Sequence, residues 1–213
     1  MTFFSYGHGE EKLKIFFNKC NSFDPHIKFE QTTSTTSIPF LDVQVIIKNN
    51  GELSTDLYTK PTDTHQYLNW TSCHPRHTKT SIPYSLALRL RRICSDNEFF
   101  EKRARELHNI LLKRGYKNKL IKECIMKARR TSRQEALTSK PISSTDRVPL
   151  VITYNPALPN IHKILKEHHQ ILLTSSNTQA IFKEPPLVAY RKGRNLTQML
   201  THKRLRSPIA DRR

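Results

Sequence analysis

The segment that decides the fold is residues 40–95, FLDVQVIIKNNGELSTDLYTKPTDTHQYLNWTSCHPRHTKTSIPYSLALRLRRICS. Its first part is rich in β-branched residues and contains Asn50-Gly51, a strong hairpin signal because a type I′ turn needs positive φ at both central positions. We therefore expect strands over 40–47 and 53–59, closed by Lys60-Pro61-Thr62-Asp63. The last part of the segment has the apolar spacing of a helix, so the hairpin leads directly into a helical domain.

Three helices are predicted to follow the hairpin. The first opens at Ser81-Ile82-Pro83, because Pro is tolerated in the first turn of a helix. Ser95-Asp96-Asn97-Glu98 fits a capping box for the second helix, and Gly115 fits a C-terminal cap at its end. A third helix is expected over about 118–136, so that two helices joined at a tight glycine turn form a helix-turn-helix-like unit. The expected core of this bundle is Leu86, Leu90, Phe100, Leu107, Leu111, Leu120 and Cys124.

The predicted fold class is α+β. A small helix-plus-β-hairpin region at 1–60, with the helix over 10–22, precedes a basic three-helix bundle at 61–137. A loosely packed basic remainder follows, with a strand over 148–154 and a helix over 161–173. We expect a linker at 138–147, a further region at 148–205 that ends in a short helix at 195–205, and a disordered tail at 206–213.

Positive charge is the strongest compositional feature of the chain. It has 213 residues with a formal net charge of +18 and an isoelectric point near 10.0. Residues 1–60 hold 6 Lys/Arg against 7 Asp/Glu, whereas residues 61–140 hold 18 against 7 and residues 141–213 hold 12 against 4. A surplus of this size indicates a polyanionic partner, and we expect nucleic acid rather than a membrane.

Cysteine usage and hydropathy favour a protein that is not secreted. The four Cys lie far apart without a CxxC pair, and no secretory leader or apolar run of ~20 residues is recognisable in the sequence. Reduced thiols are therefore expected, and the predicted location is nuclear or cytoplasmic.

Patterns for catalysis or metal binding are weak. His65, Cys73, His74 and His77 have the spacing H-x7-C-H-x2-H, which fits a structural zinc site poorly and fits a polar turn beside Trp70 better. The carboxylates Asp42, Asp56 and Asp63 show no convergence of the kind that a two-metal site needs. We expect no catalytic residues, no metal, no cofactor and no small-molecule substrate.

Basic residues on the predicted helices are the candidate nucleic-acid contacts. Three arginines lie on the first helix, and further cations frame the glycine turn between the second and third helices, where helix N-termini add N–H donors for phosphate. The predicted phosphate contacts are Arg89, Arg91, Arg92, Lys113, Arg114, Lys117 and Lys119. Lys60, His65, His74 and Lys79 are expected to contribute at the exit from the hairpin.

Several blocks of the sequence resemble one known family. PFLDV (39–43), STDLYTKPTDTHQYLNWTSCHP (54–75), IPYSLALRLRRICS (82–95) and LLKRGY (111–116) are similar to the C-terminal part of Penelope-like retrotransposon reverse transcriptases. HGEEKLKIFFNKCNSFDPHIKFE (8–30) resembles the end of their palm, and PPLVAYRKGRNLTQML (185–200) resembles their connector. The resemblance implies that residues 1–60 are a palm remnant with a primer-grip-like hairpin and that residues 61–137 are the thumb.

The same resemblance implies a fragment without catalysis. The family's metal-binding Asp residues would lie upstream of Met1, so we expect no polymerase activity. The expected function is backbone-directed binding of nucleic-acid duplex, ancestrally an RNA–DNA template–primer. Two alternatives stay open: a sequence-specific helix-turn-helix DNA-binding protein that uses a recognition helix at 118–130, and an inert relic of a truncated element. The sequence assigns no oligomeric state.

Overall fold

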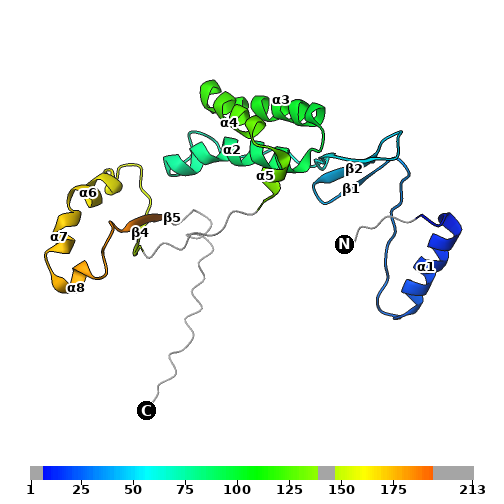
Figure 1. Ribbon diagram of the computed structural model, residues 1–213, viewed down its shortest axis with the longest axis horizontal. Helices are drawn as coiled ribbons and strands as arrows, with labels where there is room; N and C mark the ends of the chain where they lie inside the picture. The colour runs from blue at the N-terminus through cyan, green and yellow to red at the C-terminus, as the bar shows by residue number, and fades with distance from the viewer. Residues whose placement is uncertain (1–6, 139–146, 194–213) are drawn as a thin grey trace, which may run out of the picture. The chain divides into compact units, whose positions relative to one another are not determined.

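A computed structural model describes residues 7–138 and 147–193, and it confirms the α+β class (Figure 1). The chain forms two compact units. The first contains Met1–Leu68 and Ile82–Ser139, and the second contains Asn69–Ser81 and Lys140–Arg213. The helix expected at 195–205 and the tail at 206–213 lie outside the described residues, as does nearly all of the expected linker.

The hairpin region is a three-stranded antiparallel sheet in the order β1-β2-β3. Its strands are β1 (Ser37–Phe40), β2 (Val43–Ile47) and β3 (Leu53–Leu57). The single strand predicted over 40–47 was wrong, because the chain reverses at Leu41, which has a φ of 56°, and Phe40 pairs with Val43. A row of β-branched residues therefore conceals a turn that β-propensity alone does not reveal.

The hairpin between β2 and β3 is present, but its turn differs from the predicted type. Gly51 has a φ of 83°, whereas Asn50 is not among the described residues with positive φ. The Gly51 N–H donates to the Lys48 carbonyl at 2.8 Å, and the Lys48 N–H donates to the Glu52 carbonyl at 2.8 Å. This pattern is a type I turn followed by a glycine bulge, which needs only one left-handed residue.

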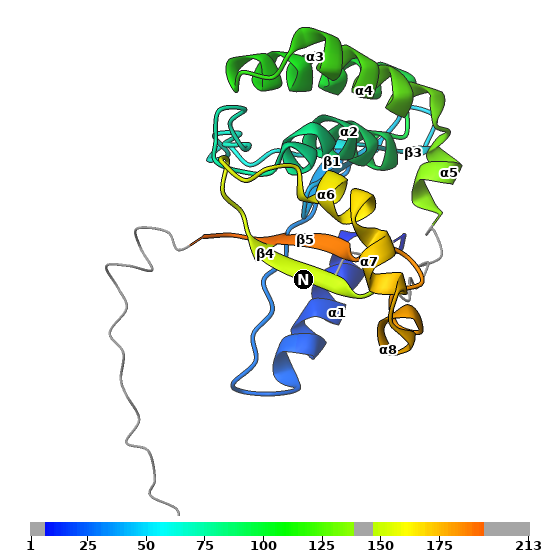
Figure 2. The same ribbon diagram turned by 90° about the vertical axis from the view of Figure 1, so that its left-hand side faces the viewer.

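Four helices follow the sheet, namely α2 (Arg76–Ile93), α3 (Asn97–Lys113), α4 (Asn118–Arg130) and α5 (Arg133–Leu137). The first unit contains α2 from Ile82 onward and all of α3, α4 and α5. Figures 1 and 2 show α3 and α4 side by side, with α2 beneath them. The expectation that α2 opens at Ser81 was wrong, because the helix begins at Arg76 and contains Pro83. Pro83 lacks the N–H for one backbone hydrogen bond of the helix, and its side chain is fully buried.

The turn between α3 and α4 is a Schellman motif, as the glycine predicted. Gly115 has a φ of 82°, and its N–H donates to the Leu112 carbonyl at 2.9 Å. The Tyr116 N–H donates to the Leu111 carbonyl at 3.1 Å, and both side chains are buried. The Tyr116 hydroxyl also donates to the Leu68 carbonyl at 3.0 Å. The glycine therefore fixes the helix-turn-helix geometry, and Tyr116 bonds the turn to the chain at Leu68.

The third helix is shorter than predicted. It ends at Arg130, and a separate short helix follows because the Ser132 hydroxyl accepts a hydrogen bond from the Glu135 N–H at 3.1 Å. Ser132 and Glu135 have the serine–glutamate spacing of a capping box, so the break carries a sequence signal. The helix predicted over 118–136 therefore joined two helices into one.

The core lies among α2, α3, α4 and α5. Of the predicted core residues, Leu90, Phe100, Leu107 and Leu111 are buried, whereas Leu86, Leu120 and Cys124 are only partly buried. Small residues complete the core and permit close helix packing. The other buried apolar residues of this part are Ala87, Cys94, Ala104, Tyr116, Ile121, Ile125, Ala128 and Ala136.

The sheet is attached to the helices by a buried ion pair. The Asp56 side chain on β3 is 9% exposed, and it accepts from Arg103 Nε at 3.0 Å and Nη2 at 2.7 Å. Burial raises the pKa of Asp56, but the hydrogen bonds from Arg103 and from the Leu57 N–H lower it more, so the pKa lies below its ordinary value. The Cys94 thiol also contacts Asp56 at 3.6 Å, and burial raises the pKa of that thiol to about 11.

Hydroxyl groups make a second connection between β3 and α3. The Ser54 hydroxyl donates to Asp96 Oδ2 at 2.8 Å, and the Thr55 N–H donates to Ser95 Oγ at 2.9 Å. The predicted capping box was wrong, because Asp96 is the N-cap of α3 and makes no capping bond. Ser95 and Asp96, the first two residues of the predicted capping box, bond to the sheet instead.

The first helix of the chain, α1 (Glu10–Ser22), matches the prediction, although none of its described residues is buried. The strand expected at 148–154 is present as β4 (Pro149–Thr153), which pairs in parallel with an unforeseen strand, β5 (Leu187–Arg191). The helix expected over 161–173 is divided at His168. The second unit thus contains α6 (Ile161–Glu167), α7 (His169–Leu173) and α8 (Ser176–Gln179).

We predict that Asp56→Asn destabilises the first unit by about 3 kcal/mol, because Arg103 then loses its buried counter-charge and keeps only the exposed Glu106 as a partner. Urea denaturation of the full chain measures this change. Asp42→Asn is the matched control, since Asp42 pairs with Arg89 at an exposed position and its loss costs under ~1 kcal/mol. Equal losses in the two variants would contradict the role given to Asp56.

Stability is expected to fall in acid. The pKa values of Asp42, Asp56 and Asp96 are all lowered, chiefly by the Arg89 hydrogen bond for Asp42 and the Lys48 hydrogen bond for Asp96. A lowered carboxyl pKa stabilises the fold above the unfolded value of ~3.9, and this stabilisation disappears as pH falls through the folded value. Thermal melts between neutral pH and strong acid should show a steep decline below about pH 4 that is weaker in Asp56→Asn.

Candidate nucleic-acid interface

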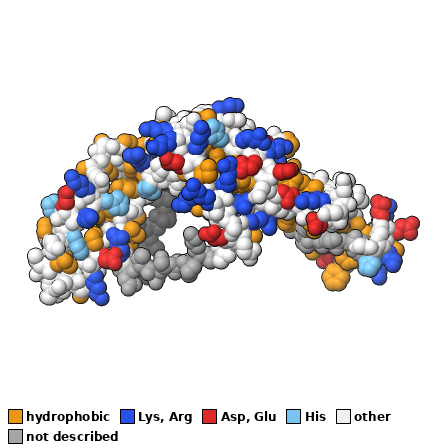
Figure 3. Space-filling model, turned by 45° about the horizontal axis from the view of Figure 1, so that its top comes forward, with side chains coloured by type: hydrophobic (Ala, Val, Ile, Leu, Met, Phe, Trp, Pro, Cys, Tyr) orange, Lys and Arg blue, Asp and Glu red, His pale blue; other side chains and the backbone are white. Residues whose placement is uncertain are grey.

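The turn between α3 and α4 presents a cluster of unpaired cations. We define the lysine cluster as Lys113, Lys117, Lys119 and Lys122. All four side chains are exposed, and none has a hydrogen-bond or ion-pair partner among the residues that the structure describes. Figure 3 shows Lys and Arg side chains in blue over the helical part of the first unit. These cations are free to bind an external anion without breaking an internal contact.

The outer face of α4 extends this cluster. Ile121, Ile125 and Ala128 point into the core, which leaves Lys119, Lys122 and Arg130 exposed on the other side of the helix. Arg130 likewise has no partner within the described ranges. Lys122 and Arg130 are absent from the primary set of predicted contacts, although the apolar period of α4 identifies both as outward-facing.

The other cations of α4 are engaged within the molecule. Arg129 forms a two-bond ion pair with Glu101, at 2.7 Å from Nε and 2.6 Å from Nη2. Lys127 Nζ lies 4.6 Å from the centre of the Tyr84 ring, a cation–π distance. The cations of α4 therefore form two groups: Lys127 and Arg129 make internal contacts, whereas Lys119, Lys122 and Arg130 have no partner among the described residues.

The predicted arginine contacts on α2 make internal hydrogen bonds. Arg89 Nε donates to Asp42 Oδ2 at 3.2 Å. Arg91 Nε donates to the Thr131 carbonyl at 3.0 Å, and Arg92 Nε donates to the Ala136 carbonyl at 2.7 Å. Carbonyls at the C-terminal ends of helices are unsatisfied and carry partial negative charge, so a guanidinium stabilises them. Arg91 and Arg92 thereby hold the ends of α4 and α5.

Arg114 has a similar structural role. Its Nε donates to the Tyr67 carbonyl at 2.7 Å, and its Nη2 donates to Gln66 Oε1 at 2.7 Å. These bonds fix the chain between the sheet and α2 against the end of α3. The composition of the helices does not reveal such bonds, because they join residues that lie far apart in the sequence.

The hairpin-exit residues occupy both units. Lys60 is exposed and His65 is partly buried, and both belong to the first unit. His74 and Lys79 belong to the second unit. There, His74 Nδ1 lies 3.2 Å from Ser72 Oγ, and Lys79 Nζ donates to the Ser72 carbonyl at 3.1 Å and lies 5.6 Å from the Trp70 ring centre.

The N-terminus of α4 offers few groups suited to reading bases. Asn118 Oδ1 lies 2.9 Å from His108 Nε2, so the side-chain amide of the first α4 residue already has a hydrogen-bond partner. The exposed positions that follow are Lys119, Lys122, Glu123 and Met126. Bidentate recognition of a base edge usually comes from Arg, Asn or Gln, so this surface suits phosphate better than sequence.

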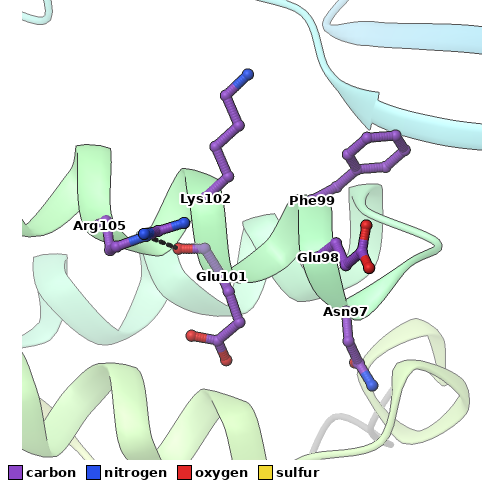
Figure 4. Close-up of a pocket in the computed structure, with 6 residues that line it drawn as sticks. All are labelled: Asn97, Glu98, Phe99, Glu101, Lys102 and Arg105. Atoms are coloured by element: carbon purple, nitrogen blue, oxygen red, sulfur yellow. Dashed lines mark hydrogen bonds between the residues drawn. The ribbon is translucent and has the colours of Figure 1, made fainter.

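A shallow depression lies along the first half of α3 (Figure 4). It is lined by Asn97, Glu98, Phe99, Glu101, Lys102 and Arg105. Arg105 Nε donates to the Glu101 carbonyl at 3.4 Å, and Figure 4 shows the Glu101 and Lys102 side chains on opposite sides of the helix. Its lining holds two carboxylates and two cations, so it has no net positive charge and is a poor surface for a polyanion.

Neither a cluster of metal-ligating side chains nor a membrane-spanning helix occurs among the described residues. No group of three or more His, Cys, Asp or Glu side chains is arranged around a common point within residues 7–138 and 147–193. Within those ranges, no helix combines the length and the apolarity that crossing a bilayer requires.

Comparison with known protein families matches residues 66–126 to the animal helix-turn-helix domain. This range covers α2, α3 and most of α4, so the helix-turn-helix prediction is confirmed. No curated protein and no solved structure matches the chain. These comparisons bring no support for the resemblance to reverse transcriptases.

We predict that Arg91→Gln combined with Arg92→Gln acts mainly on stability. Losing two guanidinium bonds to helix-end carbonyls should cost about 1–3 kcal/mol in urea denaturation. Replacing two unpaired cations, Lys119 and Lys122, by Gln is the matched control and should change stability by less than ~0.5 kcal/mol. A double arginine variant that is fully stable would show that these side chains do not hold the helix ends.

Proposed function

We propose that the chain binds nucleic-acid duplex through its phosphate backbone, with the α3–α4 turn as the contact. The observation that carries this proposal is the lysine cluster, whose four cations are exposed without partners among the described residues. The match to a helix-turn-helix domain supports the same surface, because such domains bind DNA with the second helix of the motif.

Simple electrostatics favours backbone contact. A lysine ammonium is a point charge that suits phosphate oxygens, whereas the planar guanidinium is the group that reads guanine with two bonds. Each neutralised phosphate releases condensed counterions, so binding should weaken strongly as salt rises. With the nearby arginines occupied internally, the lysines supply the free charge.

A finer assignment follows from the sequence resemblance. We propose that the helix-turn-helix domain is the thumb of a Penelope-like retroelement reverse transcriptase and that its original ligand is an RNA–DNA template–primer. The position of the matched domain, at 66–126, agrees with the thumb expected at 61–137. Under this proposal the chain binds without catalysis, needs no cofactor and acts in the nucleus or cytoplasm.

Sequence-specific DNA binding is the second candidate, favoured by the helix-turn-helix match. In that case α4 would enter the major groove and read bases with Lys119, Lys122, Glu123 and Met126. Competition separates the two candidates, because random-sequence DNA displaces a backbone binder at equal concentration but displaces a specific binder poorly.

Our direct test replaces Lys117, Lys119 and Lys122 by Gln and measures duplex affinity against salt concentration. Each lost phosphate contact should reduce the slope of log K against log salt by ~0.9, so the triple variant should lose ~2–3 units of slope. Replacing Lys12, Lys14 and Lys19 on α1 removes the same charge from exposed positions and serves as the control. An unchanged slope in the first variant, or equal changes in both, would refute the proposed contact surface.

A further inference from the structure

A cavity of about 400 Å³ lies in the first unit, beside the exit from β3 and between α2 and α3. Its apolar walls come from Leu57, Leu86, Leu90, Leu107 and Ile110. This volume falls in the range of small-molecule sites, which combine apolar walls with a few polar groups. The cavity is therefore large enough for a planar group of the size of a nucleobase.

Two polar side chains that line the cavity make no internal hydrogen bond among the described residues. The Thr59 hydroxyl and the Asn109 side-chain amide have no hydrogen-bond partner among the residues that the structure describes. The Glu106 carboxylate, which accepts from Arg103 Nη1 at 2.9 Å, also lines the cavity and retains acceptor capacity. An amide, a hydroxyl and a carboxylate together offer both donors and acceptors to a ligand.

The aromatic part of the cavity is held in place by a tight turn. His65 has a φ of 51°, and its N–H donates to Asp63 Oδ1 at 2.7 Å. The Tyr67 N–H donates to the His65 carbonyl at 2.7 Å, while Arg114 holds the Tyr67 carbonyl. The His65 and Tyr67 rings, 6.2 Å apart, are both lining residues. The left-handed backbone at His65 stores strain of the kind that accompanies functional positions.

His65 also has an unsatisfied ring nitrogen. Its Nδ1 is buried without a hydrogen-bond partner among the described residues, at 3.7 Å from Asp63 Oδ2. A neutral histidine ring carries one donor and one acceptor nitrogen, so the ring offers both functions to a ligand. A buried polar atom without a partner requires an explanation, and a ligand that repositions the ring supplies one.

The cavity lies near one cation of the lysine cluster, because Lys113 is one helical turn beyond the lining residue Asn109 on α3. Lys60 follows the lining residue Thr59 directly, and Arg89, which is paired with Asp42, also lines the cavity. A ligand in which a planar polar base is joined to a phosphate fits this arrangement, with the base in the cavity and the phosphate beside the cations. A purely apolar ligand would leave the Thr59 and Asn109 groups buried and unpaired.

We propose that this cavity takes one unstacked nucleobase, from a bulge or a frayed end of the nucleic acid bound at the lysine cluster. The inference rests on the proposed function. The base lies between the His65 and Tyr67 rings and the apolar walls of the cavity, and its polar edge bonds to Asn109, Thr59 and Glu106. Removing a base from the stack is least costly where it is unpaired, so the cavity selects duplexes with defects or open ends.

The test compares two duplexes that contain 2-aminopurine, one fully paired and one with this base as a single-nucleotide bulge. The full chain should bind the bulged duplex about tenfold more tightly, the size of effect that one base–aromatic stack produces. The 2-aminopurine emission should also change on binding. Asn109→Trp fills the cavity from an exposed position and should reduce the ratio of the bulged-duplex affinity to the paired-duplex affinity to about one.

A second variant, Thr59→Val, removes the hydroxyl at nearly constant volume and should lower the preference in a folded protein. Equal wild-type affinities for the two duplexes would contradict the base site and leave the proposed function standing. A preference for the bulge that both variants retain would also contradict it, because recognition would then lie elsewhere. Failure to bind either duplex would contradict the proposed function itself, and the base site with it.

Discussion

The arrangement of the first unit depends on the ion pair between Asp56 and Arg103. The two-bond contact joins the last strand of a small sheet to α3 of the helix-turn-helix domain. A three-stranded sheet of this length has little core of its own, so the helices must supply its stability. The hydroxyl contacts of Ser54 and Thr55 with the start of α3 fix its register. The turn after β3 that carries His65 and Tyr67 is then placed against α3, where the two rings line the cavity.

Arginine and lysine have different tasks in this domain. Arg91, Arg92 and Arg114 donate to backbone carbonyls that the helix ends and the turn before α2 leave unsatisfied. A guanidinium suits this task because it donates from a rigid fork and is always charged. Lysines, by contrast, remain unpaired around Gly115 among the described residues. The net positive charge of the chain therefore does not measure the size of the external binding surface, because many of the arginines stabilise the fold instead.

The sequence predicted the helix-turn-helix unit well because its signals are local. The period of the apolar residues locates α3 and α4, and Gly115 locates the turn between them. Contacts between distant residues could not be predicted in the same way. The Asp56–Arg103 pair, the partners of Ser95 and the parallel β4–β5 pairing each join residues about forty positions apart. For the candidate site, the lysines could be identified, whereas the internal bonds of the arginines and the cavity beside His65 required the fold.

Chemical protection of lysines tests the central claim most directly. Duplex-bound and free protein would be acetylated briefly at low salt, and modification at each lysine would be quantified by mass spectrometry. Backbone contact at the α3–α4 turn predicts strong protection of Lys113, Lys117, Lys119 and Lys122, with Lys12, Lys14 and Lys19 modified equally in both states. Uniform protection along the chain, or protection that spares the turn, would contradict the account.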